Sequence, residues 1–235
     1  MRATILRYLT FAAVLSLIAC DALIITPPLP TPPSTDYCPS CVTFFQDDLN
    51  ELVNVIVNVG PQSTCSGLCG FLSGGNSVVL CNIFCKIHGI DTFTQMIEET
   101  DADAVYLCQQ LAVCPIHDDA SASITTFAVS PASGPQGTVF SLDGTVIISS
   151  TTGAGFWDVT ISPPDAMIIT DATFVESLVP GTYNAHYTMA TNPTENEPFS
   201  SGTYDVQFAV CNGVCGAKHA HAKLLASKRT SFTIA

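Results

Sequence analysis

The sequence has few basic side chains. Seven lysines and arginines stand against twenty aspartates and glutamates in 235 residues, which gives a formal net charge of −13. Binding to the phosphates of nucleic acid requires clustered lysine and arginine, so we expect no nucleic-acid partner. The same imbalance disfavours simple attraction to anionic lipid near neutral pH.

Motifs of the common hydrolases are also missing. The chain has no Gly-x-Ser-x-Gly nucleophile elbow, no His-Glu-x-x-His zinc helix and no phosphate-binding glycine loop. A sequon for N-glycosylation is absent as well, because proline occupies the middle position of Asn192-Pro193-Thr194. We therefore expect no enzyme activity, no catalytic residues and no cofactor.

After the N-terminus, no segment is long and apolar enough to suggest a membrane span. The apolar run from Tyr8 to Ile18 follows two arginines, and its length fits a signal peptide and is too short for a bilayer. We expect residues 1–22 to be the signal peptide, and the mature protein, which would begin near Leu23, to be secreted and extracellular. Leu17-Ile18-Ala19-Cys20 also fits a bacterial lipoprotein box.

Composition divides the rest of the chain into an α-helical and a β-stranded part. Residues 23–36 are rich in proline and predict an extended leader without a core of its own. Residues 37–118 have apolar side chains at helical spacing and predict a disulfide-linked helical bundle. After an Ala/Ser linker at 120–123, residues 124–235 alternate strand-like runs with turn signals, which predicts an immunoglobulin-like β-sandwich.

Within these parts the pattern predicts five helices and nine short strands. The first helix ends at Gly60-Pro61, two helices cover 65–69 and 77–88, Asp91 caps the fourth, and Asp101 or Asp103 caps the last. The expected strands are 125–129, 138–142, 145–149, 157–161, 166–170, 183–189, 204–211, 221–225 and 231–234.

Cysteine spacing is the strongest signal in the chain. Of eleven cysteines, ten remain after removal of Cys20 with the signal, and an even number in a secreted chain indicates a disulfide framework. Cys65–Cys85 and Cys69–Cys81 have equal sums of residue numbers, as an antiparallel helical hairpin requires. Cys38–Cys114 and Cys41–Cys108 would join the first helix to the last, although sequence alone leaves the connectivity open.

A further pair of cysteines, Cys211 and Cys215, flanks an Asn-Gly turn signal and favours a local disulfide at a hairpin end. His219 and His221 alternate on an expected strand and would face one way. Together with Cys215 they form an alternative metal site, but oxidation of Cys215 would remove that ligand. We therefore expect no metal.

The spacing of six cysteines resembles that of the saposin B family; these are Cys38, Cys41, Cys69, Cys81, Cys108 and Cys114, and Cys65 and Cys85 are an addition to the pattern. The resemblance implies a helical clasp whose apolar inner face binds lipid. The first helix and the third are more apolar than one small core needs. The candidate lipid contacts are Phe44, Phe45, Val53, Val57, Val79 and Ile83.

Over nearly the whole mature chain the sequence also resembles the countin family. A saposin-like unit is followed by a β-rich part with "EPFSSG" (Glu197–Gly202) and "CGxKHxH" (Cys215–His221). Countin is a secreted component of the counting factor with which social amoebae limit group size. The resemblance implies other counting-factor subunits and a cell-surface receptor as partners, and an effect on aggregate size through adhesion and motility.

Two alternatives stay open. One is an amoebapore-like effector that permeabilises membranes, in which His88 or His117 would be the pH-sensitive group. The other is an activator that presents lipid to a separate hydrolase. Between Asp36 and Asp119, eleven carboxylates accompany a single lysine, so repulsion from an anionic membrane should fade as pH falls toward about 4.

Overall fold

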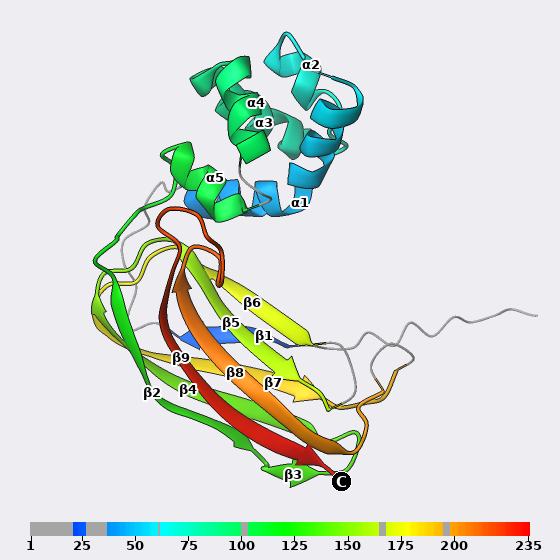
Figure 1. Cartoon of the computed structure of the whole chain (residues 1–235), viewed down its shortest axis with the longest axis vertical. Helices are drawn as coiled ribbons and strands as arrows, with labels where there is room; N and C mark the ends of the chain where they lie inside the picture. The colour runs from blue at the N-terminus through cyan, green and yellow to red at the C-terminus, as the bar shows by residue number, and fades with distance from the viewer. Residues whose placement is uncertain (1–20, 27–36, 61, 100–102, 165–167, 195–197) are drawn as a thin grey trace, which may run out of the picture.

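The computed structural model describes residues 21–26, 37–60, 62–99, 103–164, 168–194 and 198–235. Helices form the first part of this chain and strands most of the second, and the helical region lies at one end of the sheet domain (Figure 1). This confirms the expected division into a disulfide-linked helical part and a β-sheet part. Almost all of the expected signal peptide lies outside the described residues.

The helical region contains α1 (Cys38–Asn58), α2 (Cys65–Cys69), α3 (Gly75–His88), α4 (Ile90–Glu99) and α5 (Ala104–Gln110). Helix α1 ends before Gly60, which has a φ of +96° and precedes Pro61, a residue that cannot continue a helix. Asp103 caps α5, because its Oδ1 accepts a hydrogen bond of 2.9 Å from the Tyr106 amide. No helix in the described ranges is long and apolar enough to cross a membrane.

Aromatic rings fill the centre of the helical region. Phe44, Phe45, Phe84 and Phe93 are all buried, and the ring centroids of Phe45 and Phe84 are 5.9 Å apart in a stacked arrangement. Phe45 also lies 6.3 Å from Phe93 of α4. Aromatic burial of this kind contributes more than the area alone, so α1, α3 and α4 are held around one ring cluster.

The second part consists of two sheets around a shared core (Figure 1). The four-stranded sheet has the order β1-β7-β4-β2 and the five-stranded sheet β3-β9-β8-β5-β6. Their bounds are β1 Asp21–Thr26, β2 Ser121–Ser130, β3 Ser133–Gly134, β4 Val139–Ser150, β5 Gly155–Ser162, β6 Ile169–Val175, β7 Gly181–Ala190, β8 Gly202–Asn212 and β9 Lys223–Ile234. Trp157, Tyr187 and Phe208 are among the fully buried residues between the sheets.

Four sequence expectations about the sheet domain were wrong in detail. Segments 138–142 and 145–149 form one strand, β4, because Gly144 makes room for the Phe208 ring, whose Cε1 would lie 3.2 Å from an added Cβ, and does not turn the chain. Segments 221–225 and 231–234 merge into β9, whose start is delayed by His221 at a φ of +70°. Strand β2 begins at Ser121, so most of the expected linker is strand.

Strand β1 is the fourth difference. Residues 23–26 were expected in a leader without a core, but they pair with β7, with Ile24 opposite His186 and Ile25 opposite Ala185. The β-branched Ile-Ile-Thr run suits a strand better than the proline-rich residues that follow. The expected cleavage near Leu23 falls inside this strand, and residues 27–36 lie outside the described part.

Candidate functional site

Four disulfides fix the helical region. Cys38–Cys114 and Cys41–Cys108 join the start of α1 to α5 and the residues after it, and span 76 and 67 residues of sequence. Cys65–Cys85 and Cys69–Cys81 join α2 to α3 and span 20 and 12 residues. The pairs are those that the sequence analysis expects. Both sets are nested, one bridge inside the other, as in an antiparallel hairpin.

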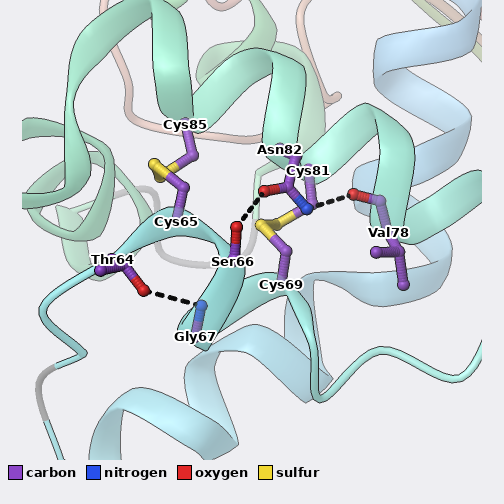
Figure 2. The surroundings of a disulfide bond; sticks show 9 residues. All are labelled: Thr64, Cys65, Ser66, Gly67, Cys69, Val78, Cys81, Asn82 and Cys85. Atoms are coloured by element: carbon purple, nitrogen blue, oxygen red, sulfur yellow. Dashed lines mark hydrogen bonds between the residues drawn. A yellow bond between two sulfur atoms is a disulfide. The ribbon is translucent and has the colours of Figure 1, made fainter.

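Figure 2 shows how the hairpin of α2 and α3 is held together. The Gly67 amide donates to Thr64 Oγ1 at 3.0 Å and caps α2, while Ser66 Oγ donates to Asn82 Oδ1 at 3.4 Å. Asn82 Nδ2 donates in turn to the Val78 carbonyl at 2.8 Å within α3. A five-residue helix is not stable alone in water, so the two bridges and this cap hold α2 in place.

The six candidate lipid contacts do not share one surface. Phe44 and Phe45 are buried in the ring cluster and Val53 is partly buried against it. Val57, Val79 and Ile83 are 72, 58 and 47% exposed. In this conformation Phe44 and Phe45 therefore serve the core, and the side chains open to an outside contact are the exposed ones on α1 and α3.

The helical region and the sheet domain meet at the start of β5. Phe156 faces away from the sheet core and is buried in the helical core together with Ala154, whereas Trp157 points between the sheets. A side chain at Gly155 would collide with the Cys211 carbonyl oxygen. A glycine between Ala154 and Phe156 thus lets β8 approach closely while Phe156 enters the neighbouring core.

Asn212, at the end of β8, ties the connection between the two parts. The residue is buried, with 2% of its surface exposed to solvent. Its Oδ1 accepts a 3.1 Å hydrogen bond from the Gly153 amide, and its Nδ2 donates a 2.8 Å bond to the His117 carbonyl. Buried polar groups are costly without partners, so Asn212 fixes the segment after α5 against the sheet.

The β8–β9 connection, residues 213–222, completes the junction and is shaped by the Cys211–Cys215 disulfide. The His219 ring stacks on Tyr106 of α5, with centroids 4.2 Å apart and planes at 10°. His221 Nδ1 lies 2.7 Å from Asp118 Oδ1. The expectation that both histidines lie on one strand face was wrong: they contact different partners, and Cys215 is oxidised.

A pocket of about 340 Å³ lies at this junction. Its walls come from α1, the start of α5, β5, β6 and the β8–β9 connection. Most of the lining is apolar, with two amides and one carboxylate: Phe45, Gln46, Leu49, Asn50, Ala104, Phe156, Asp158, Ala172 and Val214. A cavity of this size is at the lower end of the range for small-molecule sites, about 300–1,000 Å³.

Two carboxyl groups at the junction are unusual. Burial, with a smaller contribution from the Asp171 charge, raises the pKa of Asp158 to about 6. Burial also raises the pKa of Asp103, an effect opposed by the Tyr106 amide and by His219. Asp158 Oδ1 and Asp103 Oδ2 are buried without a hydrogen-bond partner. The ion pairs of the described chain involve other aspartates, Asp143 and Asp118.

Sequence reasoning missed Phe156, Asp158, Asp103 as a buried group and Asn212 as an anchor. One signal was available: in Phe156-Trp157 two large aromatic residues are adjacent on a strand and must face opposite sides. A buried ring on each side indicates a second packing surface beyond the sheet core.

The chain is similar to known proteins over both parts. Residues 36–112 match the model of the Countin N-terminal domain and residues 122–235 that of the Countin C-terminal domain. Countin-1 of Dictyostelium discoideum is 32% identical over 225 residues, which cover 95% of this chain and 84% of that protein. Countin-2 of the same organism is 37% identical, with 77 and 72% covered. Countin-3 is 30% identical, with 86 and 90% covered.

Proposed function

The chain belongs to the countin family, and from this premise we propose that it is a secreted countin-like protein of a counting-factor complex that limits group size. The observation that carries the proposal is the similarity to three countins over most of their length. It extends across both parts of the chain, and the junction between them is built from residues of both. The protein would therefore act through the two parts as one unit.

Secretion agrees with the chemistry of the cysteines. All ten that the structure describes are in five disulfides, and such frameworks persist in oxidising compartments. We assign the helical region to the saposin B type on its nested bridges and five helices. We assign the sheet domain to the immunoglobulin-like type on its two sheets and buried tryptophan.

The group-size role predicts a change in cell counts. Deleting the gene in its amoebal host should give aggregates with more cells, because a secreted limit on group size is lost. Re-expression of the whole chain should restore the count, and the secreted protein should elute from a size-exclusion column within a large complex. An unchanged number of cells per aggregate would contradict the developmental role, and a free monomer would contradict membership of a complex.

The helical region is proposed to contact lipid through α3. Val79, Ile83 and Ile87 are spaced four residues apart, so they lie on one helix face, and they are 58, 47 and 67% exposed. An exposed stripe of large apolar side chains indicates an interaction surface when it is continuous. Helix α3 itself has no carboxylate, but the acidic side chains elsewhere in the helical region oppose an anionic bilayer until they take up protons.

Binding to anionic vesicles should therefore increase as pH falls from about 7 to about 4.5, where carboxylates begin to lose charge. Flotation of vesicles with the protein measures it. Val79→Asp should weaken binding at the lower pH, whereas Val139→Asp, on a similarly exposed valine of β4 (56%), should not. Equal binding at both pH values would contradict the idea, and release of an entrapped dye would favour the membrane-permeabilising alternative.

A further inference from the structure

The pocket at the junction carries one charged group and no counter-charge. Asp158 is the only ionisable residue of the described lining, and neither lysine nor arginine is present there. Asp158 Oδ1 is enclosed by protein without a hydrogen-bond partner. A carboxylate in a partly desolvated, apolar site is destabilised unless it is paired with a cation. The site is therefore electrostatically incomplete.

We propose that this pocket binds a small organic amine, whose ammonium group pairs with Asp158 and whose hydrocarbon body lies against Phe45, Leu49, Phe156 and Val214. The walls belong to α1, β5 and the disulfide-closed β8–β9 connection, so the site is largely formed before the ligand arrives. Pre-formed apolar pockets with a few placed polar groups are typical of ligand sites.

The charge and the ligand set of the pocket disfavour three other classes of ligand. An anion would be repelled by Asp158. It would also be repelled by Asp171 of β6, whose charge acts on Asp158. A neutral apolar molecule would leave the carboxylate unpaired. A calcium ion requires six to eight oxygen ligands, and the described lining offers one carboxylate and the amides of Gln46 and Asn50.

An aromatic amine tests the proposal directly. 2-Phenylethylamine should bind the full-length protein at pH 7.5 in isothermal titration calorimetry, and its uncharged analogue 2-phenylethanol should bind at least about ten-fold more weakly, as expected for loss of a charge-assisted pair. Asp158→Asn should reduce the amine affinity by about ten-fold or more and leave the alcohol unaffected.

Two further variants separate recognition by Asp158 from a general charge effect. Asp171→Asn removes an equal charge from a residue that does not line the pocket, and it should change amine affinity by less than about three-fold. Ala172→Leu, at an exposed pocket position on β6, should weaken both probes by filling space. Undiminished amine binding by Asp158→Asn, equal binding of amine and alcohol, or no binding at millimolar amine would each overturn the proposal.

Discussion

Removing both disulfides that join α1 to the end of α5 should unfold the helical region and leave the sheet domain folded. Cys38–Cys114 and Cys41–Cys108 are nested, so either one alone still holds the two ends of the region together. Without one bridge, the unfolded chain gains only the freedom of the short segments between the two bridges, and the free energy of unfolding should fall by about 2.7 kcal/mol in the chain-entropy account. Without both, the whole loop between the first and last helix is free, and the free energy of unfolding should fall by about 7 kcal/mol.

Whole domains are stable by about 5–15 kcal/mol, so a small core should survive the loss of one bridge, whereas the loss of both should unfold it. The combined loss is also larger than the sum of the two single losses, which is the signature of nesting. Alanine is the replacement of choice, because Cys38 and Cys41 are fully buried and a serine hydroxyl would add a burial penalty of its own.

The measurement uses two separate reporters. Far-ultraviolet circular dichroism follows the helices, while fluorescence of Trp157, the single tryptophan of the chain, follows the core between the sheets. The four-alanine variant should lose the helical signal and keep a cooperative denaturant transition of Trp157. Removal of Cys211–Cys215, which spans four residues, is the control and should cost about 2 kcal/mol. Retention of the helical signal by the four-alanine variant would contradict the argument.

The helical region was predictable from sequence because its constraints are local or covalent. Apolar periodicity placed α1 and α3, and the equal spacing of Cys65–Cys69 and Cys81–Cys85 pointed to one hairpin register. Once two helices are antiparallel, bridges that share a helical face must pair in this order. Helix geometry therefore favoured this pairing over the alternatives that the sequence left open, and the structure contains it.

Glycine and histidine patterns in the sheet domain were less informative, because a residue type can serve several purposes. Asp143-Gly144 is a turn signal in sequence, yet Gly144 lies inside β4, where its missing side chain admits the Phe208 ring. His219 and His221 suggested alternation on a strand, but the Cys211–Cys215 loop directs one toward Tyr106 and the other toward Asp118.

Phe156-Trp157 could have indicated that a second packing surface exists, but the contacts of the junction could not be predicted because they join residues about a hundred positions apart. In the folded chain Tyr106 contacts His219, and Asn212 contacts His117. Asp158 has the sequence pattern of an ordinary outward-facing strand residue. Its burial arises only when α1 and α5 cover that face of β5, so the altered acid–base behaviour of Asp158 is a property of the assembled chain.

Replacing Asp158 with asparagine should stabilise the ligand-free protein above about pH 6 and have no effect below about pH 4. The pKa of Asp158 is about 6 in the folded protein, above its ordinary value of 3.8. Between these two pH values the folded state holds a proton on Asp158 that the unfolded state has released. The ionised carboxylate then destabilises the fold progressively as pH rises through that window. Because Asp158 is partly exposed to solvent, the destabilisation is smaller than the pKa shift alone implies. We expect Asp158→Asn to raise the free energy of unfolding by about 1–2 kcal/mol at neutral pH.

Urea denaturation across the pH range tests this second effect. The wild-type chain should lose stability relative to Asp158→Asn between about pH 4 and pH 6 and run parallel to it above. Asp103, whose pKa burial also raises, is present in both proteins, so its own titration contributes equally to the two stability curves. Asp205→Asn, at an exposed position of the otherwise largely buried strand β8, is the control and should change stability by less than about 0.5 kcal/mol. A pH-independent difference would show that Asp158 acts through packing. If Asp158→Asn is instead more stable and no longer binds the amine, the charge that destabilises the fold is the one that binds the cationic ligand.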